Sequence, residues 1–495
     1  MNHRAPVRAR GALRRGLLIA AVLGVGLAQP GAAHPPPPES FFAWTRLLFT
    51  PQEYARRRAA LGRALGDSGG GIFLAPSRAG LSDGTTFRQL DDFLYFTGLE
   101  VPDSVLAIEA PAGHTTLFMP RRDPRFENPT RRNDFPGRPL ADDPAVAQTA
   151  GIDAVRPIEE LAAWLAPRVR GPSGLALRVN PGRPGRASRP GGPGAIDPFP
   201  SAPVLPPDPL RDFVKYLRDT VREARLINAF TEVARLRMVK SPAEVAILRR
   251  AAHLTAQAIR HAARRGPGFV QPGTSERDLE AEFEAACKRG GAQRLAFSSI
   301  IKSGPNSLWP WRILGAQYDR RNRRLSASEL VIFDVGCELD FYASDVGRTF
   351  PVSGSFSAEQ RRVLEMEVAV VEAILRAVRP GVTLNGLAAV ARAHIPEAER
   401  PYMQASGHFG HHLGLSAGDP SLDDVPLAPG MVFTVEPWYY NHDRGLAVFT
   451  EDVLLVTPQG AEVLTAELPR SPAELERMVA PLPAPAAAVP AGQER

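Results

Sequence analysis

Five side chains that commonly bind metals occur in the second half of the chain: Asp334, Asp345, His411, Glu436 and Glu451. The acids form two pairs, one within VIFDVGCELDFYASDVGRTFP (331–351) and one within MVFTVEPWYYNHDRGLAVFTEDVLLV (431–456), and the histidine lies between the pairs. Carboxylates with one imidazole are a hard, oxygen-rich ligand set, which favours Mn²⁺ and also accepts Co²⁺, Fe²⁺ or Zn²⁺. The set therefore predicts a site for two divalent cations bridged by carboxylates.

The spacing within each pair predicts a β-hairpin that brings its two acids together. The centre of the first pair falls between Leu339 and Asp340. The centre of the second pair falls between Asp443 and Arg444, just before Gly445. Residues that face each other across antiparallel strands have Cβ atoms about 5 Å apart. Four carboxylates gathered in this way repel one another strongly unless cations lie between them.

A site of this kind predicts hydrolytic chemistry. Two divalent cations can hold one water and lower its pKa, so that hydroxide forms near neutral pH. A carboxylate beside that water can move its proton to a leaving amine. Glu436, which precedes Pro437, is the candidate for this proton transfer.

The length and charge of the chain limit its class. A chain of 495 residues is long enough for two or three domains, each with its own core. The formal net charge is +6, but residues 1–33 contain five arginines and no acid, which leaves the rest of the chain at +1. This balance gives no reason to expect a nucleic-acid partner.

The N-terminus has the pattern of a secretory signal, residues 1–33. Arg14 and Arg15 end a basic region, the apolar run GLLIAAVLGVGLA (16–28) follows, and small residues suit cleavage before His34. The apolar run is too short to span a bilayer comfortably. We therefore expect an exported protein, periplasmic or secreted, with no membrane contact after the leader is removed. An uncleaved N-terminal anchor is the alternative.

The two cysteines do not form a disulfide framework by number alone. Cys287 falls in a predicted helix and Cys337 in the first acid-bearing hairpin. Two cysteines in a large exported chain are too few to indicate a stapled scaffold. We expect two separate buried thiols.

Helical and strand patterns divide the chain into two domains, which predicts an α/β (α+β) protein. Residues 41–225 are predicted as an α/β domain, with one helix at 51–65 and strands at 71–76, 93–98, 104–110 and 115–120. A Pro- and Gly-rich stretch at 181–210 predicts a loop. Residues 230–470 are predicted as the second domain. Capping boxes at Ser241 and Ser357 predict helices at 241–263 and 357–378, and Thr274 or Ser275 is expected to cap another helix that ends at Arg289. The Ala- and Pro-rich tail, 481–495, is predicted to be disordered.

The motifs resemble those of the pita-bread metallopeptidases, and within them aminopeptidase P (Xaa-Pro aminopeptidase). The resemblance runs from about Pro51 to Thr457. The matching motifs are FRQLDDFLYFTGLEVPDSVLAI (87–108), SPAEVAILRRAAHLTAQA (241–258), FDVGCELDFYASDVGRTFPVSG (333–354), GHHLGL (410–415), TVEP (434–437) and TEDVLLVT (450–457). The resemblance implies a creatinase-like N-terminal α/β domain followed by a pita-bread catalytic domain.

The same resemblance implies an activity and its partners. Members of the family carry a dinuclear Mn²⁺ site and remove an N-terminal residue that precedes proline. Peptides with proline at the second position are therefore the expected substrates, and a homodimer or homotetramer is the expected assembly.

Several positions depart from the family pattern. The family has histidines at the positions of Trp311, Gly407 and Gly418, and an arginine at the position of Phe449. Three nearby histidines could replace the missing imidazoles in space, namely His408, His412 and His442. We take His408 as a catalytic candidate beside Glu436. Trp311 and Trp438 are candidates for an apolar wall against a proline ring, with ordinary core packing as the alternative.

Three functions remain open at the level of sequence. The first is an exported metallo-aminopeptidase of a divergent subgroup, with Glu436 as proton carrier. The second is a prolidase-type dipeptidase, which shares the same metal motifs. The third is a metal-bound peptide-binding protein with little turnover, because Trp311 and Gly418 replace the shuttle histidines. Creatinase-like hydrolysis without metal is disfavoured because the full ligand set is present.

Overall fold

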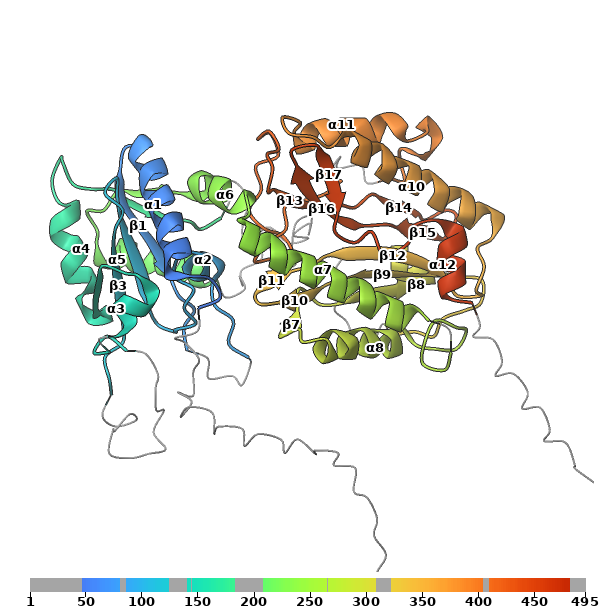
Figure 1. Cartoon of the computed structure of the whole chain (residues 1–495), viewed down its shortest axis with the longest axis horizontal. Helices are drawn as coiled ribbons and strands as arrows, with labels where there is room; N and C mark the ends of the chain where they lie inside the picture. Colours follow the sequence, from blue (N-terminus) through green and yellow to red (C-terminus); the bar gives the residue numbers. More distant parts are fainter. Residues whose placement is uncertain are drawn as a thin grey trace, which may run out of the picture.

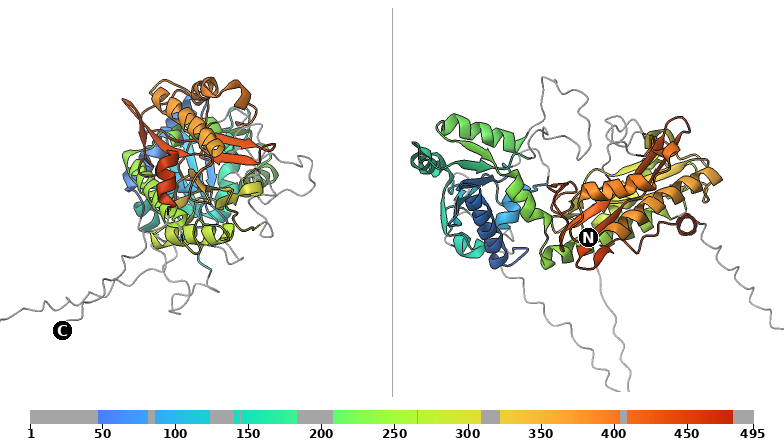
Figure 2. Two further views of the ribbon diagram at one scale, coloured as in Figure 1. Left: turned by 90° about the vertical axis from the view of Figure 1, so that its right-hand side faces the viewer. Right: turned by 90° about the horizontal axis from the view of Figure 1, so that it is seen from above.

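The computed structural model describes residues 47–80, 86–123, 140–143, 145–182, 208–264, 266–308, 322–403 and 409–480. The predicted signal, the predicted disordered tail, Trp311, Gly407 and His408 lie outside the described residues. Figure 1 shows two units side by side, an N-terminal α/β unit and a larger C-terminal unit, and the view from above in Figure 2 agrees.

A six-stranded mixed sheet organises the N-terminal unit, with strand order β4-β3-β2-β1-β5-β6. Its strands are β1 (Gly71–Pro76), β2 (Val105–Ala110), β3 (His114–Met119), β4 (Ala154–Pro157), β5 (Leu177–Val179) and β6 (Leu226–Asn228). Its helices are α1 (Pro51–Asp67), α2 (Asp91–Thr97), α3 (Ala145–Ala150), η1 (Ile158–Glu160), α4 (Leu161–Val169) and α5 (Pro209–Thr220). Alternate residues of β1 point to opposite faces: Phe73 packs in the core with α1 and α2, and Ile72 and Leu74 pack with α4 and α5.

The predicted strand at 93–98 is wrong, because residues 93–97 belong to helix α2 and Gly98 follows its last turn. Asp91 and Asp92 open this helix, and Gly98, with φ 71°, ends it in a left-handed conformation. Residues 93–97 are all buried. A helix that is buried on every side shows the same unbroken apolar run as a buried strand, so periodicity could not separate the two.

Helices cover both sides of the strands in the C-terminal unit (Figure 1). The helices are α6 (Phe230–Met238), α7 (Pro242–Ala263), α8 (Glu276–Arg289), η2 (Gly304–Leu308), α10 (Ala358–Ala377), α11 (Leu384–His394), η4 (Glu397–Glu399) and α12 (Pro472–Met478). Complete capping boxes confirm the helix starts predicted at Ser241 and Ser357, and a third box shows that Ser275, of the two expected candidates, caps α8. The pair α7 and α8 lies on one side of the strands, and the pair α10 and α11 lies on the other.

The strands of this unit form short sheets with orders β11-β10-β7, β12-β9-β8, β13-β16-β17 and β14-β15. The first acid-bearing hairpin and its neighbours are β7 (Arg294–Leu295), β8 (Ile300–Ser303), β9 (Leu330–Val335), β10 (Cys337–Leu339), β11 (Tyr342–Ala343) and β12 (Val346–Pro351). The second hairpin and its neighbour are β13 (Val432–Val435), β14 (Trp438–Asn441), β15 (Leu446–Phe449), β16 (Asp452–Thr457) and β17 (Gly460–Val463).

The centre of the second hairpin is confirmed, whereas the centre of the first is shifted. In the second hairpin Trp438 pairs with Phe449, which places the centre between residues 443 and 444. In the first, Asp334 pairs with Gly347 and not with Asp345, so the two acids are diagonal neighbours. The first turn is centred on Asp340 and Phe341, whose φ angles are 48° and 67°. A phenylalanine with positive φ is rare, so the sequence carried no signal for this turn.

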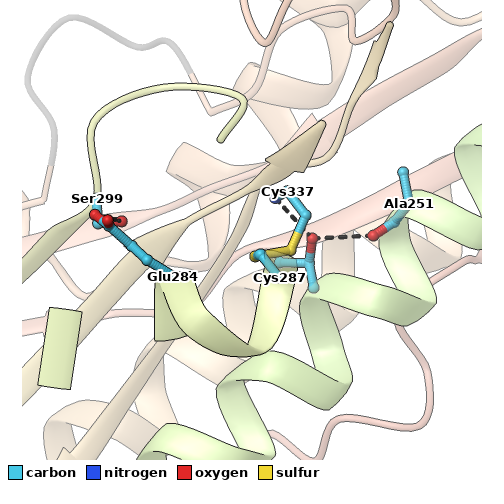
Figure 3. The surroundings of a disulfide bond; sticks show 6 residues. Ala251, Glu284, Cys287, Ser299 and Cys337 are labelled. Atoms are coloured by element: carbon cyan, nitrogen blue, oxygen red, sulfur yellow. Dashed lines mark hydrogen bonds between the residues drawn. A yellow bond between two sulfur atoms is a disulfide. The ribbon is translucent and has the colours of Figure 1, made fainter. Parts of the chain in front are cut away.

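The two cysteines form a disulfide, which overturns the expectation of separate thiols. Cys287 of α8 and Cys337 of β10 have Cα atoms 5.7 Å apart (Figure 3). The backbone N–H of Cys337 also donates to the Thr255 hydroxyl of α7 at 3.0 Å. The first acid-bearing hairpin is therefore tied to both helices beneath it. The two cysteines are 50 positions apart in the sequence, so local patterns could not show that they meet.

Across the described ranges, each helix is either too short or too polar to cross a lipid bilayer.

Candidate metal centre

Each of the four acids lies within one residue of a strand end in the C-terminal unit. Asp334 is in β9, Asp345 precedes β12, Glu436 follows β13, and Glu451 precedes β16. The two hairpins join at Gly347, whose N–H donates to Glu451 O at 3.3 Å and whose carbonyl accepts from Glu451 N at 3.0 Å. A Cβ on Gly347 would lie 2.2 Å from the Phe449 ring. Only glycine therefore permits this approach.

His411 reaches the acids because its backbone runs along β13. The Thr434 N–H donates to His411 O at 2.8 Å, and the Glu436 N–H donates to Phe409 O at 3.0 Å. Gly410 precedes the histidine with φ 156°, and a Cβ there would lie 1.9 Å from Thr434 O. A bulkier residue at this position would push His411 away from Glu436.

The structure brings all five predicted ligands into one buried cluster. His411 Nε2 is 3.6 Å from Asp345 Oδ2 and 3.7 Å from Glu436 Oε1. One ligand atom from each of Asp345, His411 and Glu451 lies within 4.8 Å of the other two. Burial is the largest cause of the raised pKa of Asp334 and of Glu436. Repulsion from Asp345 raises the pKa of Asp334 further, and repulsion from Asp334 raises the pKa of Glu436 further. These four acids and His411 therefore lie close together.

The donor set fits a divalent cation. Asp334 Oδ2, Asp345 Oδ1 and both carboxylate oxygens of Glu451 are buried and find no hydrogen-bond partner among the described residues. Burial, followed by repulsion from the neighbouring acids, raises the pKa of Glu451 well above its usual value. Buried, unpaired carboxylates are costly, and hard oxygen donors with one imidazole suit divalent cations. A bound cation would remove both the repulsion and the unmet hydrogen-bonding capacity.

Trp438, two residues after Glu436, packs with Phe449 in a small buried core cluster that includes Ile332 and Ala447. The rings of Trp438 and Phe449 stack with centroids 3.8 Å apart and planes 24° apart, and both side chains are 0% exposed. Burial, and then repulsion from Asp334, raise the pKa of Glu436, while the neighbouring Trp438 side chain opposes that rise. Phe449 thus replaces the arginine of the family pattern with a ring that supports Trp438.

The described histidines near the site do not replace the missing imidazoles. His412 follows His411 on a strand-like segment, so its side chain points to the other face, where it packs near Phe433 with ring centroids 6.3 Å apart. Burial, and then Lys240, lower the pKa of His412 to about 3. His442 lies in the turn between β14 and β15, beside Tyr440. Gly418 lies in the loop after His411, next to Asp419.

Sequence-based reasoning missed Arg348, which contacts the backbone of a candidate ligand. Arg348 is 0% exposed and donates to Glu451 O at 2.6 Å and to Asp452 Oδ1 at 2.7 Å. It therefore fixes the backbone on which Glu451 is carried. The signal was an arginine in the otherwise apolar strand VGRTFP (346–351), together with an acid beside the last ligand.

Comparisons with known proteins match both units of the chain. The family described as "Metallopeptidase family M24" matches residues 246–458, and "Aminopeptidase P, N-terminal domain" matches residues 54–175. The Xaa-Pro aminopeptidase of Escherichia coli is 30% identical over 465 residues, covering 86% of this chain and 97% of that protein. The Xaa-Pro dipeptidase of Pyrococcus furiosus is 32% identical over 235 residues, covering 46% of this chain and 64% of that protein.

The solved structures show the same likeness in three dimensions. The structure of aminopeptidase P from E. coli with the inhibitor Pro-Leu has a TM-score of 0.65 and 27% sequence identity. The match covers 87% of this chain and 98% of that chain. Both units of the fold described above are therefore shared.

Proposed function

The chain belongs to the aminopeptidase P family of M24 metallopeptidases, and we propose that it removes the N-terminal residue from peptides in which proline comes second. The predicted fold class, a creatinase-like α/β domain followed by a pita-bread domain, is confirmed by the matches to both units. The observation that supports the activity most strongly is the buried cluster of Asp345, His411 and Glu451, with carboxylate oxygens that find no partner in the described part of the chain.

We assign the metal ligands to Asp334, Asp345, His411, Glu436 and Glu451. Two divalent ions, with Mn²⁺ best suited to these donors, are the proposed cofactors. When bound, such ions supply a water of lowered pKa as the nucleophile. This chain's carboxylates and His411 would hold the ions, and the Gly347–Glu451 backbone contact joins the two hairpins that carry the acids.

Glu436 is the proposed proton carrier. Its Oε1 lies 3.7 Å from His411 Nε2. A carboxylate beside the attacking water can take up its proton, and Glu436 is the buried acid of the cluster that we assign to this role. As water adds to the carbonyl carbon and the C–N bond breaks, Glu436 delivers that proton to the proline nitrogen. Trp438 borders this carboxylate and shields it from bulk solvent; contact of Trp438 with substrate stays a prediction.

Two alternative functions, a dipeptidase and a peptide-binding protein, are judged by different observations. A dipeptidase is less favoured because the dipeptidase relative matches 46% of the chain, whereas the aminopeptidase relative matches 86%, including the N-terminal unit. A binding protein with little turnover is favoured by one observation, since His412 and His442 stand away from the cluster. His408 and Trp311 remain proposed site residues, and both lie outside the described ranges.

Release of the first residue from Xaa-Pro-Xaa peptides by the Mn²⁺-loaded protein is the expected result. Glu436→Ala is expected to lower that rate by at least about 10²-fold, because it removes general acid–base help and a ligand together. Glu462→Ala is the matched control, since Glu462 lies on β17 and pairs with Arg249 at the surface. Cleavage of Xaa-Pro dipeptides alone would favour the dipeptidase, and folded protein without any cleavage would favour the binding protein.

We also propose export, with residues 1–33 removed. The Cys287–Cys337 disulfide supports export because disulfides persist in oxidising compartments. Protein isolated from the extracytoplasmic fraction is expected to have the intact mass of a chain that begins at His34. That mass should be lower by the two hydrogens that are lost when the disulfide forms. Reduction is expected to lower the free energy of unfolding by about 2–4 kcal/mol. A full-length mass with two free thiols would contradict the proposal.

Peptides are the proposed partners, and a homodimer or homotetramer is the proposed assembly, since the family resemblance implies both. The near-neutral charge of the chain beyond residue 33 gives no electrostatic footprint for nucleic acid. Light scattering after size exclusion would support the assembly with a mass of several chains, and the mass of a single chain would contradict it.

A further inference from the structure

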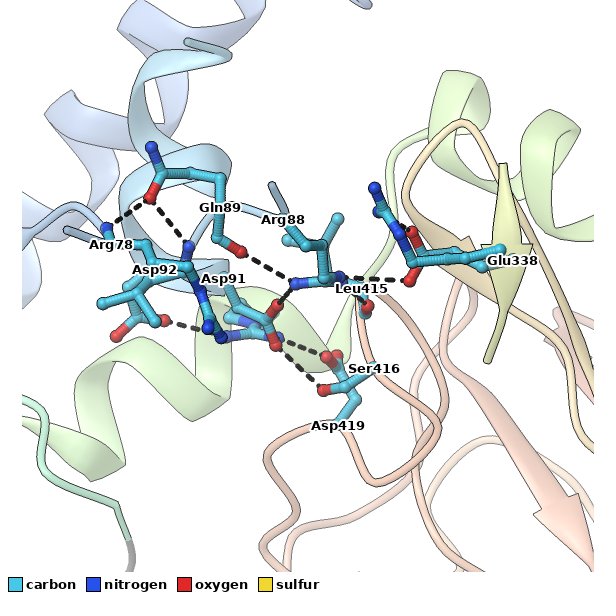
Figure 4. A network of polar contacts seen from close by, with 12 residues as sticks. Arg78, Arg88, Gln89, Asp91, Asp92, Glu338, Leu415, Ser416 and Asp419 are labelled. Atoms are coloured by element: carbon cyan, nitrogen blue, oxygen red, sulfur yellow. Dashed lines mark hydrogen bonds and ion pairs between the residues drawn. The ribbon is translucent and has the colours of Figure 1, made fainter. Parts of the chain in front are cut away.

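Charged side chains join the N-terminal unit to both segments that carry the metal ligands. We call this group the domain clamp; it consists of Arg88, Asp91, Arg237, Glu338 and Asp419. Figure 4 shows Arg88 and Asp91 meeting Glu338 of the hairpin strand β10 and Asp419 of the loop that follows His411. Arg237 of α6 completes the group. These elements are far apart in the sequence, so their meeting is a property of the fold.

Arg88 contacts both ligand-bearing segments with a single guanidinium. Its Nε donates to Glu338 Oε2 at 3.1 Å, and Glu338 lies in β10, between the ligands Asp334 and Asp345. Its Nη2 donates to the carbonyl of Leu415, four residues after His411. Its Nη1 donates to Asp91 Oδ1 at 2.5 Å, which anchors the group to α2.

Arg237 of α6 holds the same loop from the other side. Its Nη2 donates to Asp91 Oδ2 at 3.0 Å and to Asp419 Oδ1 at 2.5 Å. The Arg237 side chain is 4% exposed and that of Asp419 is 2% exposed. The Asp419 carboxylate also lies against the backbone of its own loop. A Cβ added to Gly414 would lie 2.4 Å from Asp419 Oδ2, so a side chain at position 414 would displace it.

The loop and the hairpin also touch each other directly. The Ala343 N–H, two residues before Asp345, donates to Gly414 O at 2.8 Å. The Asp419 N–H donates to His412 O at 3.1 Å, beside His411. A displacement of the loop at Leu415 or Asp419 would therefore move His411 and Asp345 relative to each other.

We propose that Arg88 is a positioning residue through which the N-terminal domain sets the spacing of His411 and Asp345, and with it the affinity for divalent metal. This inference rests on the proposed metal centre. Its physical basis is that an arginine fork fixes two acceptors in one plane, and that groups supporting the ligands change metal affinity by about 10–100-fold. A role confined to domain docking would leave metal affinity unchanged.

The test uses the full mature chain, stripped of metal and titrated with Mn²⁺ by calorimetry. Arg88→Gln is expected to weaken Mn²⁺ binding about tenfold. Arg88→Lys is expected to fall between it and the unaltered protein, because an ammonium cannot hold Glu338 and Leu415 in one plane. The visible absorption of the Co²⁺-loaded protein, which reports ligand geometry, is expected to shift for Arg88→Gln.

Arg361→Gln is the matched control. Arg361 is partly exposed on α10 and pairs with Glu476, away from both ligand-bearing segments. If Arg88→Gln binds Mn²⁺ as tightly as the unaltered protein, or loses no more affinity than Arg361→Gln, the inference is overturned. If Arg88→Gln does not fold, Ser416→Ala replaces it. Ser416→Ala removes the hydrogen bond that the Ser416 hydroxyl donates to Asp91 Oδ2 at 2.9 Å. If this variant does not weaken Mn²⁺ binding, the inference is overturned. Absence of Mn²⁺ binding by the unaltered protein would instead refute the proposed function, and the inference with it.

Discussion

Asp345→Asn is expected to abolish peptide hydrolysis and, at the same time, to stabilise the metal-free protein. The carboxylate lies 3.6 Å from His411 and shares the cluster with Glu451. Loss of one ligand removes the water of lowered pKa, so the rate should fall by more than about 10⁴-fold. Without metal, the same carboxylate is a buried charge among like charges, and its removal should raise the free energy of unfolding by about 1–4 kcal/mol.

The two halves of this prediction are measured separately. Hydrolysis and Mn²⁺ binding are compared for the loaded proteins, and denaturant unfolding is compared in the presence of a chelator. Asp340→Asn is the control, because Asp340 lies in the turn of the same hairpin and pairs with Arg250 at the surface. A variant that is inactive but also less stable without metal would show that Asp345 is structural, which contradicts the assignment.

Raising the pH is expected to destabilise the metal-free protein and to leave the Mn²⁺-loaded protein almost unchanged. Burial first, and repulsion between neighbours second, raise the pKa of Asp334, Asp345, Glu436 and Glu451. A carboxyl whose pKa is raised in the fold contributes stability below its unfolded pKa of about 4. That stability is lost as the pH rises toward the folded values, at about 1.4 kcal/mol per pH unit for each proton retained by the fold.

Unfolding in guanidinium at a series of pH values, with chelator or with Mn²⁺, measures this difference. Bound cations keep the carboxylates ionised, so the loaded protein should show a much flatter dependence, and metal binding should release protons. Proton release is read by calorimetry in two buffers of different ionisation enthalpy. The same pH dependence with chelator and with Mn²⁺ would mean that the carboxylates do not hold the metal.

The sequence predicted the second hairpin better than the first for a physical reason. In the second, Gly445 with φ 62° marks the turn and the register places Trp438 opposite Phe449. In the first, Asp340 and Phe341 both adopt positive φ, which no local pattern indicates. The shifted register makes Asp334 and Asp345 diagonal neighbours, yet their side chains still reach the same cluster, because diagonal pairs on one face remain within reach.

The candidate ligands could be predicted because two pairs of acids with one histidine between them are visible in the sequence itself. The residues that position them could not, because their partners lie far away in the sequence. Arg88 and Glu338 are separated by 250 positions, and Arg348 reaches Glu451 O across 103 positions. Contacts of this kind depend on how the two units pack, which neither periodicity nor residue spacing reports.

The replaced residues around the centre change its surroundings more than its ligands. Phe449 supports Trp438 by stacking, and next to Gly418 the loop carries Asp419, which Arg237 holds. The described part of the chain thus retains a compact ligand cluster while losing groups that would handle protons and substrate. Catalysis at this site is therefore expected to depend heavily on Glu436.

The most direct measurement titrates Mn²⁺ into the metal-stripped protein while following release of the first residue from an Xaa-Pro-Xaa peptide. Bound metal is counted in the same samples. Release that rises with bound Mn²⁺ and levels off at about two ions per chain is the predicted result. Full loading without release, or release that is independent of metal, would contradict a metal-dependent aminopeptidase.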